Sequence, residues 1–580
     1  MERYVCFGLL GYRWTARTEF AHAIKERVIP LALSGETSPE VRVIKHKLLR
    51  DSFIISSRDS SPDMFVKVHK YERPAERLKT LFRASKAKAE WRMSGQMFDT
   101  GLPVAEPLAF GERSSGGVVT GCALIQRALP ECDTLSGYIV KELSRLTNKE
   151  SVLVSEAIDA FLGSLGRLIR QMHSAGFWHP DLHTGNILVE TGTAPPKLWL
   201  VDLHSAGHAS DLSSRRRIAD LAKMIFSLDG FLDQSQLRKV LTGYCPEASA
   251  AKIGEMLARL LVAAASLRRR RQKSRAMRCL KTSGRFVVEE RMNSRIYRRR
   301  DVDEAMILDA INCHRQITAS KGPGFIKETK KSMLTAFSLP RGAGESIYVK
   351  QFANRGIIRF LENTFYIHRG RRAWKASHLL RILDVPCAEP IALVEERKLG
   401  LLHTSYLLMK EISDAARLDV FLQRSYFRIS GRLAHQEILR KRSFVRAGAH
   451  ALREFHAKRI YQKDLSPKNV LVRNDGDGKV RFYCVDSDSV EFPWRVSFRR
   501  RIKNLAQLNG LPTCITTTDR LRFYKEYFGV QNITLRHRLF LSIIRLISGR
   551  RVAISRRIDE ALRGPDPEES EAYEDITSLQ

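Results

Sequence analysis

The chain contains one sequence unit written twice, and this repeat constrains its fold more than any other feature. Lys67 and Lys350 are 283 positions apart, and the same offset relates Trp91 to Trp374. Further pairs keep that offset: Pro103 and Pro386, His173 and His456, Asp181 and Asp464, and Asn186 and Asn469. After one inserted residue, Asp202 pairs with Asp486. Chance does not hold so many identities in register over about 150 residues, so we interpret the chain as a duplication.

Length and composition set the number of domains that the two copies can form. A chain of 580 residues, of which 43% are hydrophobic, can form several globular domains of about 100–200 residues each. We predict a first unit at 1–265, a basic linker or exposed helix at 266–285, a second unit at 286–562 and an acidic tail at 563–580. The linker rests on the basic run SLRRRRQKSRAMRCLKTSGR, and the disordered tail on the acidic, turn-rich GPDPEESEAYEDITSLQ.

Charge and cysteine content limit the partners and the compartment. The net charge of +35 favours polyanions, which are nucleic acid, an anionic membrane surface or a phosphorylated acidic substrate, and it does not choose among them. The nine cysteines never form Cys-x-x-Cys, which argues against a disulfide framework and against zinc. The N-terminus is a poor signal peptide, and the most apolar run falls short of the roughly 18–20 residues that span a bilayer. We expect a soluble cytoplasmic protein, with a peripheral membrane contact left open.

The hydrophobic pattern of the first copy predicts a mixed α+β domain. The segments VRVIKHKLL, SFIIS and MFVKVH have the composition of three short strands separated by polar turns. A charged helix is predicted from about 75 to 98, and a second, more buried helix ends at Gly176, a favourable C-cap. After the polar loop HPDLHTGN, two apolar strands, ILVE and LWLVD, form a hairpin. Asp202 therefore lies at the end of a strand.

A set of polar residues in this order matches the needs of phosphoryl transfer, in which every part manages charge. Lys67 on the third predicted strand would hold the phosphates of ATP, and Glu90 on the helix would fix this lysine. Asp181 would orient the attacking hydroxyl, while Asn186 and Asp202 would hold Mg²⁺. The spacing from Asp181 to Asn186 in HPDLHTGN is that of the kinase catalytic loop. The sequence therefore predicts an ATP- and Mg²⁺-dependent phosphotransferase.

The second copy keeps four of these groups in the same roles: the catalytic Asp464, the phosphate-binding Lys350, and the metal ligands Asn469 and Asp486. Gln462 stands in place of His179, and Ala373 stands in place of Glu90. Glu362 lies eleven residues before Ala373 and is a poor substitute. Without a carboxylate partner the lysine would be poorly aimed, so we expect reduced or absent activity. An active kinase of altered geometry and a domain that only binds nucleotide, substrate or its twin stay open.

The order of these motifs resembles the protein-kinase-like superfamily. The stretch EWRMSGQMFDTGLPVAEPLAFGE and the loop HPDLHTGNILV resemble the bacterial lipopolysaccharide core kinases, the Kdo and heptose kinase family. The resemblance covers roughly 60–230 and, less fully, 340–510. It implies two tandem bilobal domains, each with a small antiparallel-sheet N-lobe and a mainly helical C-lobe. It also implies phosphorylation of a sugar hydroxyl of the lipopolysaccharide inner core, on an anionic lipid-linked acceptor at the cytoplasmic face of the inner membrane.

Two other functions compete with this interpretation. The glycine-rich loop of ordinary protein kinases is absent, because no glycine lies between Gly35 and Gly95, but a kinase acting on protein or on another small molecule stays open. The alternative of a non-catalytic scaffold, binding membrane or nucleic acid through its Arg runs, gives no reason to keep Lys67, Asp181 and Asp202 together. Nucleic acid is therefore not expected as a partner.

Overall fold

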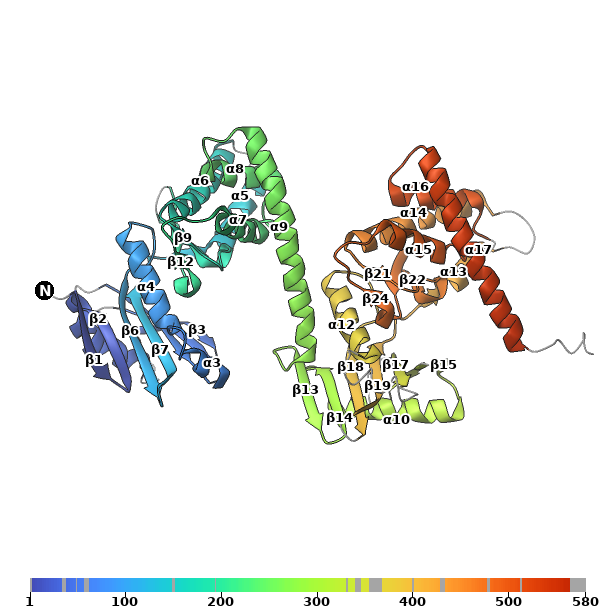
Figure 1. Cartoon of the computed structure of the whole chain (residues 1–580), viewed down its shortest axis with the longest axis horizontal. Helices are drawn as coiled ribbons and strands as arrows, with labels where there is room; N and C mark the ends of the chain where they lie inside the picture. Colours follow the sequence, from blue (N-terminus) through green and yellow to red (C-terminus); the bar gives the residue numbers. More distant parts are fainter. Residues whose placement is uncertain are drawn as a thin grey trace, which may run out of the picture. The chain divides into compact units, whose positions relative to one another are not determined.

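The computed structural model describes residues 3–33, 38–47, 49–56, 62–72, 74–148, 152–192, 195–329, 332–339, 346–353, 368–398, 401–427, 433–476, 480–511 and 514–563. The chain divides into two compact units, Met1–Arg270 and Arg271–Gln580 (Figure 1). Their boundary falls in the segment 266–285, where the sequence predicts a linker. Its first residues continue helix α9 (Ala250–Ala276), which is followed by a 3₁₀ turn, η5 (Met277–Leu280). The predicted tail lies outside the described residues from 564 onward.

The first part of unit 1 is a seven-stranded antiparallel sheet with the strand order β1-β2-β6-β7-β5-β4-β3. Its strands are β1 (Tyr4–Leu9), β2 (Tyr12–Arg17), β3 (Val41–Lys47), β4 (Arg50–Ile55), β5 (Met64–Lys70), β6 (Pro107–Ser115) and β7 (Val118–Arg127). The three predicted strands are β3, β4 and β5, as expected. The sequence did not reveal the hairpin of β1 and β2, so the strand that carries Lys67 is the fifth along the chain.

The charged segment after β5 forms two helices, where the sequence predicted one. Helix α3 (Pro74–Lys79) ends early, and α4 (Lys86–Asp99) begins after Ser85, whose hydroxyl accepts a hydrogen bond from the backbone of Lys88 at 3.2 Å. Ser is a strong N-cap, because its side chain satisfies one of the N–H groups that a new helix leaves open. The new start sets the position of Glu90 on α4.

The second part of unit 1 is mainly helical, and its hydrophobic core is separate from the core of the sheet. Its helices are α5 (Leu135–Asn148), α6 (Val152–Ser174), α7 (Ser214–Leu228), α8 (Gln234–Tyr244) and α9. Short strands accompany them: β8 (Cys132–Thr134), β9 (Phe177–Trp178), β10 (Ile187–Glu190), β11 (Lys197–Leu200) and β12 (Gly207–His208). The predicted stop at Gly176 is confirmed, since this residue has φ +80° and a Cβ there would lie 2.3 Å from the carbonyl oxygen of Ala209.

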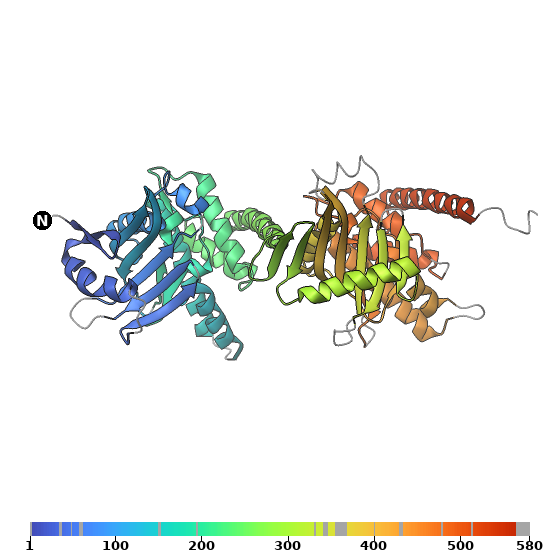
Figure 2. The ribbon, with the colours of Figure 1, turned by 90° about the horizontal axis from the view of Figure 1, so that it is seen from below.

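Unit 2 repeats this architecture, with a sheet in the order β13-β14-β18-β19-β17-β16-β15. Its strands are β13 (Phe286–Arg291), β14 (Ser294–Arg299), β15 (Phe325–Thr329), β16 (Ser332–Ser338), β17 (Ser346–Ala353), β18 (Pro390–Lys398) and β19 (Leu401–Lys410). Helix α10 (Glu304–Ser320) lies across one face of the sheet (Figure 2). Unit 1 has there a continuous but irregular helical segment, made of η1 (Thr18–Phe20), α1 (Ala21–Ala23), the π-helical η2 (Ile24–Val28) and α2 (Ile29–Leu33), which packs against the core of its sheet. The repeat therefore includes the first hairpin of each unit, beyond the region that the sequence identities reveal.

The helical part of unit 2 contains the remaining elements. Its helices are α12 (Arg369–Ile382), α13 (Leu418–Tyr426), α14 (His435–Ala457), α15 (Phe498–Leu508), α16 (Thr517–Phe528) and α17 (Leu535–Arg563). Its strands are β20 (Ala415–Arg417), β21 (Tyr461–Gln462), β22 (Val470–Asn474), β23 (Val480–Cys484) and β24 (Val490–Glu491). Helix α12 corresponds to α4, and α14 and α16 correspond to α6 and α8.

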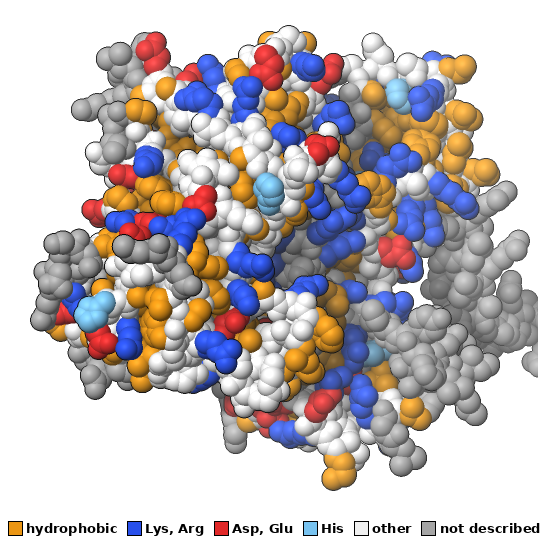
Figure 3. Space-filling model, turned by 60° about the vertical axis from the view of Figure 1, so that its left-hand side comes forward, with side chains coloured by type: hydrophobic (Ala, Val, Ile, Leu, Met, Phe, Trp, Pro, Cys, Tyr) orange, Lys and Arg blue, Asp and Glu red, His pale blue; other side chains and the backbone are white. Residues whose placement is uncertain are grey.

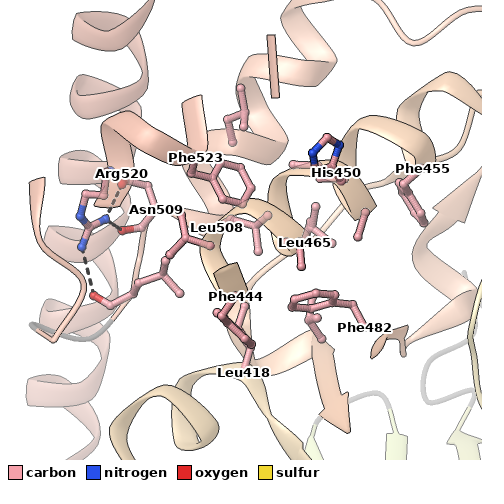
Figure 4. A pocket seen from close by; sticks show the side chains of 18 of the residues that line it. Leu418, Phe444, His450, Phe455, Leu465, Phe482, Leu508, Asn509, Arg520 and Phe523 are labelled. Atoms are coloured by element: carbon pink, nitrogen blue, oxygen red, sulfur yellow. Dashed lines mark hydrogen bonds between the residues drawn. The ribbon is translucent and has the colours of Figure 1, made fainter. Parts of the chain in front are cut away.

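These last two helix pairs pack differently. In unit 1 a Cβ on Gly166 of α6 would lie 2.0 Å from the carbonyl oxygen of Val240 on α8, so only glycine permits this approach. In unit 2 the equivalent position is the buried Ala449, so α14 holds there the side chain that the approach of α8 excludes in unit 1. A Cβ on the preceding residue, Gly448, would meet Phe482 and Phe523 at 3.5 Å, which is an ordinary contact. A mainly apolar cavity of about 1060 Å³ lies beside α14 (Figure 4). Its lining includes Leu418, Phe444, Leu465, Phe482, Leu508 and Phe523.

Candidate active site

The centre of the site in unit 1 is a buried ion pair between the sheet and helix α4. Lys67 lies on β5 between β4 and β7, and 3% of its surface is exposed. Its Nζ donates to Oε1 of Glu90 at 2.7 Å and to Oε2 at 3.0 Å. Because Glu90 is also buried, this pair fixes the ammonium group in one place.

Asp202 approaches the same lysine from the end of β11. One of its carboxylate oxygens lies 3.4 Å from Nζ of Lys67 and accepts from Nδ1 of His204 at 3.0 Å, and the other lies 3.6 Å from a guanidinium nitrogen of Arg50. Burial alone would raise the pKa of Asp202, but the hydrogen bond from His204 and the charges of Lys67 and Arg50 outweigh it and hold the pKa well below its usual range. The carboxylate is therefore ionised and suited to bind a cation.

The backbone at Asp202 is in the left-handed region, with φ 63° and ψ 49°. This conformation is uncommon for a residue other than glycine, and it persists only where the surrounding structure imposes it. Asp486 in unit 2 has nearly the same angles, φ 61° and ψ 51°. Both units therefore aim this aspartate through the same strained turn.

The loop between β9 and β10 carries Asp181 and Asn186. The amide nitrogen of Asn186 donates to the carbonyl oxygen of Asp181 at 2.9 Å, so the amide oxygen of Asn186 remains as its cation ligand. The side chain of Asp181 is 63% exposed, and one of its oxygens lies 3.7 Å from Nε2 of His183. An exposed carboxylate at this position can accept a proton from a hydroxyl group that arrives from solvent.

Buried His179 ties this loop to the segment that joins β11 to Asp202. Its Nε2 lies 3.3 Å from the carbonyl oxygen of Val201, and its Nδ1 accepts from the backbone N–H of Asp181 at 3.2 Å. Asp220 on α7 accepts from the backbone N–H of His179 at 2.7 Å. Burial lowers the pKa of His179, so the ring is neutral and can donate from one nitrogen while it accepts at the other.

Two sets of groups could hold a divalent cation in unit 1. Ligand atoms of Glu90, Asp202 and His204 lie within 4.8 Å of one another. Glu90, however, already accepts from Lys67, so a cation at that cluster would compete with the ammonium group. The oxygens of Asn186 and Asp202 are hard ligands of the kind that Mg²⁺ prefers. The contacts of Asp202 to Lys67 and Arg50, at 3.4 Å and 3.6 Å, are longer than the bonds from Lys67 to Glu90, so a cation displaces less at Asp202 than at Glu90. The donor set therefore fits Mg²⁺ at the residues that the sequence predicts.

Unit 2 holds its lysine differently from unit 1. Nζ of Lys350 donates to a carboxylate oxygen of Asp486 and, at 2.9 Å, to Oδ1 of Asp488. The expectation that this lysine lacks a carboxylate partner is wrong, because Asp488 replaces the missing helix glutamate. Glu362, the other candidate, lies outside the described residues.

The loop of unit 2 keeps two hydrogen bonds of its counterpart and adds one from the side-chain amide of Asn469 to Oδ2 of Asp464 at 3.1 Å. Nε2 of Gln462 donates to the carbonyl oxygen of Val485 at 2.8 Å, the same bond that His179 makes to Val201. The amide of Asn469 donates to the carbonyl oxygen of Asp464 at 2.9 Å. The substitution of His by Gln therefore preserves the link between the loop and the strand that precedes Asp486.

Sequence reasoning missed several residues of the two sites: Arg50 and His204 in unit 1, and Asp488 and Arg369 in unit 2. It named Gln462 only as the loss of a histidine. One signal was present. The segment Asp202-Leu203-His204 corresponds to Asp486-Ser487-Asp488, so the second copy gains a carboxylate two residues after the metal aspartate. A comparison of the two copies one position at a time does not connect the carboxylate gained at Asp488 with the carboxylate lost at Ala373.

The surface charge and the apolar character of the helices are relevant to the partners of the chain. On the face shown in Figure 3, Lys and Arg side chains are spread widely among fewer Asp and Glu side chains, in agreement with the net charge of +35. Among the described residues, none of the helices combines the length and the apolar character needed to span a membrane.

Comparisons with known proteins agree with the geometry. The model of the lipopolysaccharide kinase (Kdo/WaaP) family matches residues 67–244 and 324–527, which together exceed half of the chain. The chain is 26% identical over 136 residues to the 3-deoxy-D-manno-octulosonic acid kinase of Actinobacillus succinogenes, covering 23% of this chain and 49% of that protein. It is 29% identical over 140 residues to the kinase of the same name from Pasteurella multocida, covering 24% and 52%. The chain therefore spans about half the length of these relatives.

A solved structure, WaaP in complex with acyl carrier protein, matches with a TM-score of 0.33 and 20% identity, covering 44% of this chain and 99% of that one.

Proposed function

Since the chain belongs to the lipopolysaccharide kinase (Kdo/WaaP) family, we propose that unit 1 transfers the γ-phosphoryl group of ATP to a sugar hydroxyl of the lipopolysaccharide inner core. The two matched segments confirm the resemblance and the tandem duplication that the sequence predicts. The relatives are named kinases of 3-deoxy-D-manno-octulosonic acid (Kdo), which makes Kdo the first acceptor to test and a heptose the second. In this proposal each unit is a bilobal kinase-like domain, with its sheet as the small lobe.

The buried ion pair of Lys67 and Glu90 is the observation that carries the proposal. A lysine held by two carboxylate oxygens at 2.7 Å and 3.0 Å cannot be explained as a solvated strand residue. Removing a lysine and a glutamate from water costs free energy, so the pair needs a compensating role. Holding nucleotide phosphates is such a role, because the ammonium group then acts as a fixed positive charge.

The remaining residues have separable tasks. Asp181 accepts a hydrogen bond from the acceptor hydroxyl and takes its proton as the oxygen attacks the γ-phosphorus, while the bond from that phosphorus to the bridging oxygen breaks and ADP leaves. Asn186 and Asp202 would hold Mg²⁺, which would neutralise the charge of the phosphates. His179 keeps the backbone of Asp181 next to Val201, the residue before Asp202.

The basic character of the chain suits an anionic, lipid-linked acceptor. Arg215 and Arg216 are exposed at the start of α7, and the guanidinium group of Arg216 lies 3.8 Å from the ring centre of Trp178, directly before the catalytic loop. A cation at this place can attract the carboxylate or phosphate groups of an inner-core sugar. The proposal therefore includes a peripheral contact with the cytoplasmic face of the inner membrane.

The proposal is tested with labelled ATP, Mg²⁺ and the purified full chain. The acceptor panel contains a lipid A precursor bearing Kdo, the same lipid extended by heptose, a generic protein substrate and an aminoglycoside. We expect label on one of the two lipids, and none when Asp181 is replaced by Asn. Transfer only to protein or aminoglycoside would overturn the choice of acceptor, and transfer by Asp181→Asn at the wild-type rate would overturn the assignment of the base.

A further inference from the structure

Unit 2 departs from unit 1 at the two positions that hold the lysine, and the departures compensate each other. Helix α12 has Ala373 where α4 has Glu90, so it offers Lys350 no carboxylate. The loop after the metal aspartate has Asp488 where unit 1 has His204, and Oδ1 of Asp488 lies 2.9 Å from Nζ of Lys350. The negative charge has moved from the helix to the loop.

A second exchange concerns the positive charges. Arg50 on β4 faces Asp202 in unit 1, and the strand register places Ser332 at the equivalent position in unit 2. Unit 2 instead has Arg369 at the first residue of α12, where unit 1 has Lys86. Nε and Nη2 of Arg369 donate to Oδ2 of Asp488 at 2.8 Å and 2.5 Å. Each site therefore has two cations and two carboxylates, in a different arrangement.

Asp488 is suited to this role by its surroundings. Its side chain is 3% exposed, and its two oxygens accept from different partners, one from Lys350 and one from Arg369. A buried carboxylate held from two sides has little freedom, so it fixes the lysine as Glu90 fixes its counterpart.

The rest of the nucleotide site is present in unit 2. Asp486 keeps the left-handed turn, and Asn469 keeps the bond to the carbonyl oxygen of Asp464. Gln462 keeps the link that His179 makes in unit 1. Nη1 of Arg369 is buried and has no hydrogen-bond partner within the described part of the chain, so one donor beside Asp488 is available to an anionic ligand.

We infer that unit 2 is a second Mg²⁺-nucleotide site, in which Asp488, held by Arg369, replaces the helix glutamate as the partner of the phosphate-binding lysine. The inference rests on the proposed function, because the role of Lys350 is taken from that of Lys67. It assigns binding to unit 2 and leaves the transfer reaction with unit 1.

The test measures equilibrium binding of Mg²⁺ and AMP-PNP, an ATP analogue that is not hydrolysed, to the full chain. Lys67→Met removes the site of unit 1 and leaves the site of unit 2 to be measured by itself. In that background Asp488→Asn should weaken the binding of Mg²⁺ and AMP-PNP to unit 2 at least about tenfold. This is the loss expected when a group that holds phosphate loses one charged partner.

The control variant is Asp519→Asn, which breaks another buried pair of unit 2, Asp519 with Lys441 at 2.7 Å, in its helical part. It should lower thermal stability as much as Asp488→Asn does and leave nucleotide binding unchanged. A double variant supplies the rescue, since Ala373→Glu with Asp488→His installs the residues of unit 1 and should restore binding that Asp488→His alone removes.

The outcomes separate the two proposals. If Lys67→Met abolishes all binding, unit 2 binds no nucleotide and the inference is wrong, while the proposed function stands. If Asp488→Asn leaves the second site unchanged, the inference is also wrong, because Asp488 is then not the partner that matters. If Lys67→Met changes nothing and Asp488→Asn removes the only binding, unit 2 is the nucleotide site and the assignment of Lys67 fails.

Discussion

The buried pair of Lys67 and Glu90 makes a quantitative prediction. Glu90→Gln keeps the volume of the side chain and one acceptor oxygen but removes the charge. Among the residues that the structure describes, Asp202, at 3.4 Å, is then the one remaining anionic partner of Lys67. Breaking a buried pair by removing one partner costs about 3–5 kcal/mol of folding free energy. Because glutamine keeps one acceptor oxygen, we expect the loss of folding free energy in this variant to be about 3 kcal/mol. Because the lysine is then less well fixed, the barrier to transfer should rise by about 2 kcal/mol, a loss of about thirtyfold in kcat/KM.

Stability and activity must be separated in this experiment. The pair of Lys441 and Asp519 is a matched control, since its ions are also 2.7 Å apart and buried but lie in the helical part of unit 2. Unfolding by urea and transfer of labelled phosphate are measured for Glu90→Gln and Asp519→Asn. We expect similar losses of unfolding free energy and a loss of transfer in Glu90→Gln alone. If both variants lose transfer equally, Glu90 acts through general stability and the argument for its role fails.

Three further predictions follow from other parts of the structure. Gly166→Ala should lower the melting temperature, because its Cβ would lie 2.0 Å from a carbonyl oxygen. Gly448→Ala, a mid-helix control with room for a Cβ, should be neutral or stabilising by up to about 1 kcal/mol, and equal effects would contradict the close approach of α8 at Gly166. Burial lowers the pKa of His378 to about 3. Below the ordinary value of 6.5 the unfolded chain therefore binds a proton that the folded chain excludes, and the unfolding free energy decreases by about 1.4 kcal/mol for each unit by which the pH is lowered. His378→Phe, which keeps the aromatic contact with Trp374, should flatten the dependence of the unfolding free energy on pH between 6.5 and 4, and an unchanged slope would count against this. Asp202→Asn should weaken binding of ATP at limiting Mg²⁺ in the chain with Lys350→Met, and unchanged affinity there would remove Asp202 from the metal site.

Local sequence patterns predicted the parts of unit 1 that are set by nearby residues. The alternation in MFVKVH predicts β5 and the position of Lys67 on it, and Gly176 predicts the end of α6 because only a residue tolerant of positive φ fits there. The spacing of Asp181 and Asn186 predicts their loop, since a short polar segment between a helix and a hairpin has few alternatives.

The features that the sequence did not predict depend on contacts between residues that are distant in the sequence. The hairpins β1–β2 and β13–β14 share a place in their sheets but few residues, so the repeat is invisible there without the strand pairing. The break before α4 depends on the cap at Ser85, which a charged, helix-favouring stretch conceals. Asp488 compensates for Ala373 through space, from a position more than 100 residues later in the chain.

The most direct test of the central claim compares Asp181→Ala with Asp464→Ala in the full chain, with the same Kdo-bearing lipid acceptor and after each variant is shown to be folded. The account predicts that Asp181→Ala loses about 10²–10⁴-fold in transfer, the range expected for a general base, while Asp464→Ala loses much less. Equal losses, or a larger loss from Asp464→Ala, would contradict it, since the reaction would then depend on unit 2.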